Sequence, residues 1–282
     1  KIPMVPVRVR APLIIARSMS DAASLSRLKL THEPPAVNTV LVKSCFSAAP
    51  SALFPVARVH CIGRNYAAHA AEMGDDPKKS SPFFFQKPTS AVVDTSATSD
   101  VTTIAMPRFT SNLHFEAELV LAVGRASDGP VPIPSALEYI SGVGVGCDLT
   151  RRDLQNEAKE KRRPWDDSKG FDESAPVGGL VDIAADQNPS NRWWWSDSTV
   201  LSLTVNGVKK QETGTKKMIW NPAEIIHHIS TRHNLRPGDL IFTGTPEGVG
   251  ALSLGDEVVV RLEGGEGEWR GETECIFRIR DR

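Results

Sequence analysis

The segment Phe115-Glu-Ala-Glu-Leu-Val-Leu-Ala-Val123 joins a run of strand-forming apolar residues to two acidic residues at its start. Because successive side chains of a strand point to opposite faces, Glu116 and Glu118 share one face, and Ala117 and Leu119 share the other. Two like charges about 7 Å apart on one face repel each other and are costly to bury unless a cation lies between them. The pair is therefore either a ligand set for a hard divalent ion, which prefers oxygen, or a solvated strand face.

The same short, β-branched or apolar pattern recurs along the chain and predicts strands. The further strand segments are residues 56–62, 83–85, 142–147, 200–205, 239–243, 257–262 and 273–279. Helical patterns are fewer and cover residues 65–73, 135–140, 150–161 and 222–233. Because strands outnumber helices and do not alternate with them one for one, the sequence predicts an α+β, mainly β fold rather than a doubly wound parallel sheet.

The composition excludes several classes of protein. With 282 residues, of which 40% are hydrophobic and 24% charged, the chain can build a sizeable core, which argues against a disordered or fibrous protein. The net charge of −1 gives no basic field for a phosphate backbone, so no nucleic-acid partner is expected. No apolar stretch approaches the length that spans a bilayer, so no membrane segment is expected. The four cysteines include no Cys-x-x-Cys pair, which favours free thiols in a reducing compartment.

Residues 1–54 differ from the rest of the chain in charge. They contain seven basic and two acidic residues, a local charge of +5, which leaves −6 for residues 55–282. An Arg-rich organelle presequence is one interpretation, but Pro3, Pro6 and Pro12 would interrupt the amphipathic helix that a presequence needs. The sequence therefore predicts a basic, proline-containing arm over residues 1–54 and one folded domain over residues 55–282.

A third carboxylate, Asp148, follows the apolar run Gly142-Val-Gly-Val-Gly-Cys147, where a strand is predicted to leave the core. Its simplest role is to cap the helix that is predicted to follow, and its alternative role is to join the two glutamates as a metal ligand. The glycines at positions 142, 144 and 146 lack the spacing of a dinucleotide-binding loop. They indicate instead that another backbone or side chain approaches this strand closely.

Five further residues have side chains suited to substrate chemistry. Arg152 and Gln155 are three apart on one predicted helix face, and Lys169 precedes a glycine. A guanidinium suits a substrate carboxylate, and an ammonium suits an oxyanion or an enolate. His69 and Glu72 are also three apart, so the carboxylate can hold the imidazole in the tautomer that acts as a base toward water. Each of these groups is also common on an ordinary protein surface.

Two further segments are each rich in one residue type, the first in glycine and the second in tryptophan. The turn Gly244-Thr-Pro-Glu-Gly-Val-Gly250 lacks the lysine of a phosphate loop, so it offers a small anion only backbone amides and the Thr245 hydroxyl. The run Trp193-Trp-Trp195 lies in a polar segment and predicts a surface loop anchored by stacked indoles, or an oligomer contact, in preference to a ligand platform.

Taken together and in this order, the motifs resemble those of the fumarylacetoacetate hydrolase family. The matching segments are Cys61-Ile-Gly-Arg-Asn-Tyr-Ala-Ala-His69, Phe85-Gln-Lys-Pro88, Leu113-His-Phe-Glu-Ala-Glu118, Gly146-Cys-Asp-Leu-Thr-Arg-Arg-Asp-Leu-Gln155, Lys169-Gly-Phe-Asp172, Gly238-Asp-Leu-Ile-Phe-Thr-Gly-Thr-Pro-Glu-Gly-Val-Gly250 and Gly255-Asp256. Within the family, the chain is most similar to the small acylpyruvase and oxaloacetate decarboxylase type. The resemblance implies a mainly β roll with mixed β-sandwich character and a homodimeric assembly.

The resemblance also implies a role for each matching residue. Glu116, Glu118 and Asp148 would hold Mg²⁺, with Mn²⁺ or Ca²⁺ as alternatives. A dyad of His69 and Glu72 would activate water on a mobile lid. The remaining site residues would be Lys169, which stabilises an enolate, and the substrate-binding residues Arg152, Gln155, Lys87 and Thr245.

The activity implied by the resemblance is cleavage of a carbon–carbon bond in a 2-oxo acid through a metal-bound enolate. The substrate would be an acylpyruvate that is hydrolysed or oxaloacetate that is decarboxylated. Isomerisation or decarboxylation of an unsaturated diacid from aromatic catabolism is an alternative, and a catalytically silent metal-binding homologue is another. The expected partners are a small 2-oxo acid and a second copy of the chain, in the cytoplasm or in mitochondria.

Overall fold

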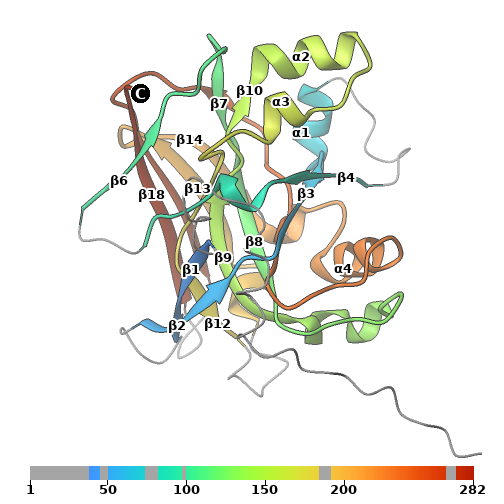
Figure 1. The fold of residues 1–282 in the computed structure, drawn as a ribbon. Coiled ribbons are helices and arrows are strands. Elements are labelled where there is room, and N and C mark those ends of the chain that lie inside the picture. The colour runs from blue at the N-terminus through green and yellow to red at the C-terminus, as the bar shows by residue number, and fades with distance from the viewer. Residues whose placement is uncertain (1–37, 45–49, 74–81, 97–99, 184–191, 265–270) are drawn as a thin grey trace, which may run out of the picture. The chain divides into compact units, whose positions relative to one another are not determined.

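The computed structural model describes residues 38–44, 50–73, 82–96, 100–183, 192–264 and 271–282 (Figure 1). Most of the predicted basic arm falls on residues 1–37 and therefore lies outside the described residues. In the described part, strands outnumber helices, as expected for a mainly β fold.

The largest sheet has ten strands and contains the most apolar segments of the sequence. Along the sheet the order is β2-β1-β12-β9-β8-β15-β3-β4, and β11 pairs with both β9 and β5. The bounds are β1 (Thr39–Ser44), β2 (Pro50–Pro55), β3 (Arg58–Gly63), β4 (Phe83–Lys87), β5 (Val92–Asp94), β8 (Ala117–Val123), β9 (Ile140–Cys147), β11 (Ala175–Val177), β12 (Leu180–Asp182) and β15 (Asp239–Phe242).

Two smaller sheets complete the β structure of the described residues. A five-stranded sheet has the order β14-β13-β17-β18-β6, and a three-stranded sheet has the order β10-β7-β16. Their bounds are β6 (Thr102–Ala105), β7 (Leu113–Phe115), β10 (Thr150–Arg151), β13 (Val200–Val205), β14 (Val208–Gly214), β16 (Gly250–Ala251), β17 (Glu257–Gly264) and β18 (Gly271–Arg280). Asn206 and Gly207, both at positive φ, form the tight turn between β13 and β14 that an Asn-Gly pair favours.

The helices are short, and three of them gather at one end of the ten-stranded sheet. The α-helices are α1 (Ala67–Glu72), α2 (Arg152–Glu160), α3 (Asp166–Lys169) and α4 (Pro222–Ser230), and the 3₁₀ helices are η2 (Thr89–Ala91), η3 (Ile133–Tyr139), η4 (Trp193–Trp195) and η5 (Thr215–Lys217). Helices α1, α2 and α3 lie at the opposite end of the sheet from β1, β2 and β12 (Figure 1). None of the described helices has the length and apolar character of a membrane span.

Helix α4 starts where the sequence predicts, and its start illustrates a complete cap. The Asn221 side chain accepts a hydrogen bond from the backbone amide of Glu224, and the Glu224 carboxylate accepts one from the backbone amide of Asn221. This reciprocal pair satisfies two amides at the helix start, and Pro222 follows at the first helical position, where its missing N–H costs little.

Strand β8 is buried on both faces, which fixes the alternation of its side chains. Leu119 and Leu121 pack in one hydrophobic core with apolar side chains of β13, β17 and β18. Val120 and Ala122 pack in a second core with apolar side chains of β3 and β15. A shift of the strand by one residue would exchange the two faces, so the register of β8 is strongly specified.

The glycines of β9 allow close packing, as the sequence predicts. A Cβ atom on Gly146 would lie 2.9 Å from the carbonyl oxygen of Pro176, and one on Gly144 would lie 3.0 Å from a methyl group of Leu180. The contact at Gly146 is closer than a side chain tolerates, and the one at Gly144 would require Leu180 to move, so the glycines let β11 and β12 pack closely against β9.

Strands β1 and β2 lie within residues 1–54, the segment expected to form an arm, and β1 pairs in parallel with β12. One feature differs from the expectations drawn from the sequence. The tryptophan run is not a surface loop: Trp193 and Trp194 are only 6% and 2% exposed and belong to the main hydrophobic core. Burial of two indoles removes a large apolar area from water, which outweighs the polar character of the flanking residues.

Candidate active site

Three buried carboxylates converge at the end of the sheet where α1, α2 and α3 gather. Glu116 and Glu118 stand at the start of β8, and Asp148 follows β9. The antiparallel pairing of Ala117 with Cys147 places the two acidic segments side by side, and the Asp148 amide donates a 2.8 Å hydrogen bond to the Glu116 carbonyl. One oxygen from each of the three side chains lies within 4.8 Å of one from each of the others. The convergence predicted for these residues is therefore present.

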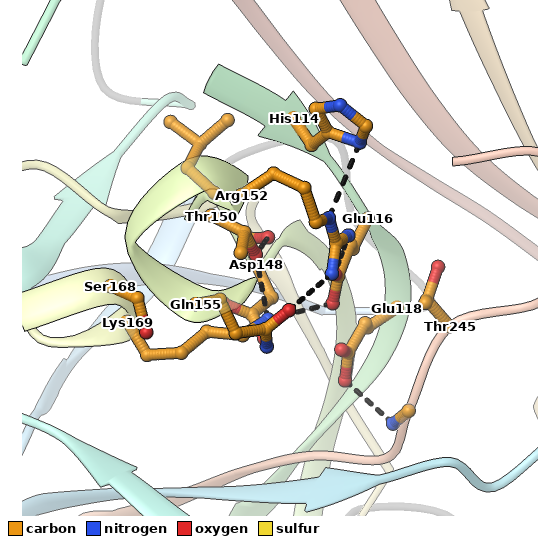
Figure 2. A network of polar contacts seen from close by, with 12 residues as sticks. His114, Glu116, Glu118, Asp148, Thr150, Arg152, Gln155, Ser168, Lys169 and Thr245 are labelled. Atoms are coloured by element: carbon orange, nitrogen blue, oxygen red, sulfur yellow. Dashed lines mark hydrogen bonds and ion pairs between the residues drawn. The ribbon is translucent and has the colours of Figure 1, made fainter. Parts of the chain in front are cut away.

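Two cations from neighbouring helices contact Glu116. The Lys169 ammonium, at the end of α3, lies 2.8 Å from Glu116 Oε2 and 2.6 Å from Asp148 Oδ2. Its third contact is the Thr150 hydroxyl oxygen at 2.6 Å. Arg152, at the start of α2, donates from Nη2 to Glu116 Oε1 and from Nη1 to Gln155 Oε1 (Figure 2). Because all these side chains are buried, the contacts act in a medium of low dielectric constant.

The three carboxylates differ in how well their charge is balanced. Burial alone would raise the pKa of Glu116, but the adjacent Lys169 and Arg152 hold it below its ordinary value. Burial, together with the negative charges of Asp148 and Glu116, raises the pKa of Glu118 well above its ordinary value. Glu118 makes no ion pair with any described residue; its Oε2 accepts a 2.6 Å hydrogen bond from the backbone amide of Gly244.

This imbalance fits a divalent metal ion. Asp148 Oδ1 is buried and accepts no hydrogen bond from any described residue, although the Lys87 ammonium lies 2.8 Å away. The three side chains offer only oxygen donors, which hard divalent ions prefer. Asp148 Oδ1 has free lone pairs, and Glu118 has no cation partner among the described residues. Glu116, Glu118 and Asp148 are therefore a group of carboxylates that could hold a divalent ion.

The predicted histidine–carboxylate dyad is also assembled. His69 and Glu72 lie on α1, and the distance from His69 Nδ1 to Glu72 Oε2 is 3.2 Å. His69 is buried and lines the same cavity as the three carboxylates, whereas the Glu72 side chain is 40% exposed and lies outside the cavity lining. When Nδ1 donates its proton to Glu72, Nε2 is left as the proton acceptor.

The four residues expected to bind substrate do not all reach the cavity. Arg152, Gln155 and Thr245 line it, together with Lys169. Lys87 does not: its ammonium contacts Asp148 Oδ1 and donates hydrogen bonds to the Leu149 carbonyl, the Lys169 carbonyl and the Ser174 hydroxyl. A fully buried ammonium needs such acceptors, so Lys87 positions Asp148 from behind the cavity.

Other residues of the site were not singled out from the sequence. Gln211 on β14 donates to the Thr245 hydroxyl at 3.0 Å and accepts from the Ala117 amide at 2.9 Å, so it ties the turn after β15 to the start of β8. Nothing in the sequence around Gln211 marks it, because its strand was not predicted. The cavity is also lined by Arg64, Met73, Phe83, Phe85, Lys159 and Trp165.

Comparison with known proteins gives the family. The profile for the fumarylacetoacetate (FAA) hydrolase C-terminal domain matches residues 58–272. The chain therefore belongs to the fumarylacetoacetate hydrolase family of enzymes, as its motifs indicate.

Named relatives and solved structures agree with this assignment. Fumarylpyruvate hydrolase from Ralstonia sp. is 42% identical over 185 residues, which cover 64% of this chain and 88% of the relative. A mitochondrial oxaloacetate tautomerase from Arabidopsis thaliana is 38% identical over 208 residues, which cover 73% and 86% of the two chains. The structure of fumarylpyruvate hydrolase from Pseudomonas aeruginosa in complex with Mn²⁺ and pyruvate matches with a TM-score of 0.77 at 39% identity, covering 90% of this chain and 100% of that one.

Proposed function

We propose that the chain is a divalent-metal-dependent hydrolase that cleaves a carbon–carbon bond of an acylpyruvate-type 2-oxo acid. The observation that carries the proposal is the His69–Glu72 dyad in the same cavity as three converging carboxylates. A base for water and a site for a Lewis acid are the two elements that such a hydrolysis requires. The named hydrolase relatives, at 39% and 42% identity, support the same reaction.

The metal site supplies the electrophilic part of the chemistry. Glu116, Glu118 and Asp148 would hold the ion, which when bound supplies Lewis-acid stabilisation of negative charge on the oxygens of a 2-oxo carboxylate. Lys169 lines the cavity and adds a fixed positive charge beside the carboxylates, where an enolate oxygen would be stabilised. Arg152, Gln155 and Thr245 offer donors that orient the substrate.

The dyad supplies the proton transfer. His69 takes a proton from water at Nε2, and Glu72 stabilises the resulting imidazolium through Nδ1. The activated water attacks the carbonyl of the acyl group, and the bond between that carbonyl and the methylene of the pyruvate part breaks. The products are a carboxylic acid and the enolate of pyruvate, which accepts a proton to give pyruvate. Since oxaloacetate decarboxylation requires no attacking water, His69 distinguishes the two reactions.

Replacement of His69 tests the hydrolase assignment directly. We expect His69→Ala to lower kcat for acylpyruvate hydrolysis by about 10²- to 10⁴-fold, the usual contribution of a positioned base. The matched control is His228→Ala on α4, outside the cavity lining, which should leave kcat unchanged. Dialysis against EDTA should abolish the activity, and Mg²⁺ or Mn²⁺ should restore it. Equal hydrolysis rates in His69→Ala and the parent would remove His69 from the mechanism.

A second candidate function is enolate chemistry without hydrolysis. The oxaloacetate tautomerase from Arabidopsis thaliana, at 38% identity, favours it, since tautomerisation moves a proton and breaks no carbon–carbon bond. Oxaloacetate decarboxylation and isomerisation of an unsaturated diacid use the same metal-stabilised enolate. A panel of acylpyruvates, oxaloacetate and unsaturated diacids, assayed with Mg²⁺ for products, separates these reactions, and no turnover on any of them would favour a silent metal-binding homologue.

Three further features belong to the proposal. Mg²⁺ is the proposed native ion, because the donor set is all oxygen, with Mn²⁺ or Ca²⁺ as substitutes. The proposed assembly is a homodimer, as the family resemblance implies, and light scattering would test it by a mass twice that of the chain. The proposed compartment is the cytoplasm or the mitochondrion, supported by three buried free cysteines among the described residues and by the mitochondrial relative.

A further inference from the structure

The side-chain amide of Gln211 is buried beside the candidate active site. Gln211 is 2% exposed, whereas Lys210 and Glu212, which flank it in β14, are exposed. Burial of an amide is costly unless its donors and its acceptor find partners. Its Oε1 accepts a 2.9 Å hydrogen bond from the backbone amide of Ala117, at the start of β8. The oxygen of this side chain is therefore satisfied by the strand that carries the acidic residues.

The nitrogen of the Gln211 side chain contacts the turn that follows β15. Nε2 donates to the Thr245 hydroxyl at 3.0 Å and to the Pro246 carbonyl at 2.9 Å. Gly248 lets this turn approach closely, because its φ is +90° and a Cβ atom there would lie 2.5 Å from the carbonyl oxygen of Lys210. The close approach and the two hydrogen bonds hold the turn against β14.

These partners leave the Gln211 amide only one orientation. The Ala117 N–H can only donate, so it must meet the side-chain oxygen. The Pro246 carbonyl can only accept, so it must meet the side-chain nitrogen. Exchange of the two ends would set donor against donor and acceptor against acceptor. The group that contacts the Thr245 hydroxyl is therefore an N–H donor.

The orientation of the amide decides the role of the Thr245 hydroxyl. An amide nitrogen accepts no hydrogen bond, so the Thr245 oxygen accepts from Gln211 and keeps its own hydrogen for another partner. Among the described residues, none accepts that hydrogen. Thr245 lines the cavity that contains the three carboxylates, and it lies on the Glu118 side of the site (Figure 2). The cavity wall therefore presents a hydroxyl donor that the described chain leaves unused.

We propose that Gln211 is a positioning residue that fixes Thr245 as a hydrogen-bond donor to an anionic oxygen of the bound substrate. This inference rests on the proposed function, in which a 2-oxo acid brings such oxygens into the cavity. Gln211 does not line the cavity, so it acts through Thr245. A donor that is oriented before the substrate arrives loses little freedom on binding, which is the advantage of a preorganised site.

A double-mutant cycle on Gln211 and Thr245 tests this role by binding, without turnover. The probe is oxalate, a dianion at neutral pH whose oxygens only accept hydrogen bonds, titrated calorimetrically into the Mn²⁺-loaded protein. We expect Thr245→Val to weaken oxalate binding about 10- to 100-fold, the value of a hydrogen bond to a charged group. Gln211→Met alone should weaken it about 3- to 10-fold, because the hydroxyl then rotates freely among its staggered positions. In the Thr245→Val background, Gln211→Met should change the affinity by less than about twofold.

A control and a rescue accompany the cycle. Lys210→Met, the same substitution at an exposed neighbour of Gln211, should leave oxalate binding unchanged. Thr245→Ser, which keeps the hydroxyl, should retain most of the affinity and its dependence on Gln211. If Gln211→Met does not fold, as judged by urea unfolding, Gln211→Glu takes its place in the cycle. Its Oε1 still accepts from Ala117, its ionised carboxylate offers Thr245 no donor, and the effect of its charge is common to both backgrounds.

Two results would overturn the inference. One is a Gln211→Met variant that binds oxalate as tightly as the parent. The other is a pair of losses that multiply in the double variant, because Gln211 would then act on the site as a whole rather than through Thr245. Failure of the proposed function is a separate outcome, since oxalate binding requires no turnover. Coupling of the two residues in a protein that hydrolyses no acylpyruvate overturns only the proposed function, and a hydrolase without the coupling overturns only the inference.

Discussion

The adjacent strands β8, β15 and β3 have a buried carboxylate near each end of the group, Asp239 at one end and Glu118 at the other. The two carboxylates differ in how the chain balances their charge. At one end, Asp239 at the start of β15 accepts hydrogen bonds from Arg58 Nε at 2.8 Å and from Arg58 Nη2 at 2.5 Å. The backbone amide of Arg236 donates a third at 2.9 Å. At the other end, the buried Glu118 receives one backbone hydrogen bond and no ion pair from the described residues.

The difference separates a structural charge from a functional one. A bidentate pair with one guanidinium satisfies Asp239 within the chain, so this end needs no ligand. At the other end, Lys169, Arg152 and Lys87 are ion-paired with Glu116 or Asp148, whereas Glu118 lies beside these two carboxylates with no cation partner among the described residues. Buried charge that the chain leaves unbalanced is the physical sign of a binding site, and balanced buried charge is a sign of architecture.

The largest expected effect comes from neutralising Glu118. Glu118→Gln should abolish metal-dependent turnover, because it removes one of the three carboxylates proposed to hold the ion. The same change should raise the free energy of unfolding in EDTA by about 1–3 kcal/mol, because it relieves the burial of an unpaired carboxylate next to two others. Urea unfolding with EDTA and assays with Mn²⁺ measure the two effects. A variant that is less stable than the parent in EDTA would contradict the interpretation of Glu118 as an unbalanced charge.

Neutralising Asp239, at the other end of these strands, should lower the stability and leave the turnover nearly unchanged. Asp239→Asn should lower the free energy of unfolding by about 2–3 kcal/mol, because Arg58 loses its only described carboxylate partner; Arg58 is 25% exposed, so solvent reduces the loss. Turnover per folded molecule at 15 °C should stay within about twofold of the parent. Urea unfolding and an active-site titration measure these quantities together, and a loss of turnover without a loss of stability would place Asp239 in the function.

The smallest effect is a pH dependence of stability at the same end. His60 is 1% exposed; burial, partly offset by Asp239 and reinforced by the positive charge of Arg58 and by His233, lowers its pKa to about 4. Between about pH 6.5 and 4 the unfolded chain binds this proton and the folded chain does not, so stability falls as the pH falls. His60 should account for a loss of about 2 kcal/mol between neutral pH and pH 5.

The variant His60→Asn isolates this contribution. Asn keeps a group in the position of Nδ1, which lies 3.3 Å from Gln86 Nε2, and removes Nε2, which has no hydrogen-bond partner among the described residues. Urea unfolding at pH 7 and pH 5 should show a smaller decrease in stability for the variant than for the parent. Identical decreases would mean that His60 has the same pKa in the folded and unfolded states, which would contradict the prediction.

The two ends also differ in how far the sequence predicts them. The period of two in β8 places Glu116 and Glu118 on one face, and the site contains both. The link to Asp148 depends on the register of β8 against β9, a pairing across more than twenty residues that no local pattern encodes. The grouping of Asp148 with the two glutamates was implied by the motifs that the chain shares with the fumarylacetoacetate hydrolase family. Asp239 lies in one of the matching segments but Arg58 does not, and the parallel pairing of β3 with β15 brings the two together.

The misplaced expectations have a common physical cause. Lys87 was assigned to the pocket because the sequence shows its charge but not that its side chain contacts Asp148 from behind the cavity. Lys159 was not singled out from the sequence, because its contact with Trp165 and its place in the cavity lining arise only in the folded chain. Strands β5, β11 and β12 have three residues each, too few for a periodic signal, and they form because long-range partners hold them.

The burial of β8 on both faces has a consequence for the evolution of this scaffold. Glu118 stands near the start of β8, whose side chains are all buried, so substitutions there are constrained by the whole core. Lys159 lies at the last turn of a short helix and belongs to neither hydrophobic core. Substitutions on the short helices that line the cavity can therefore change the substrate range, while the carboxylates at the start of β8 stay the same.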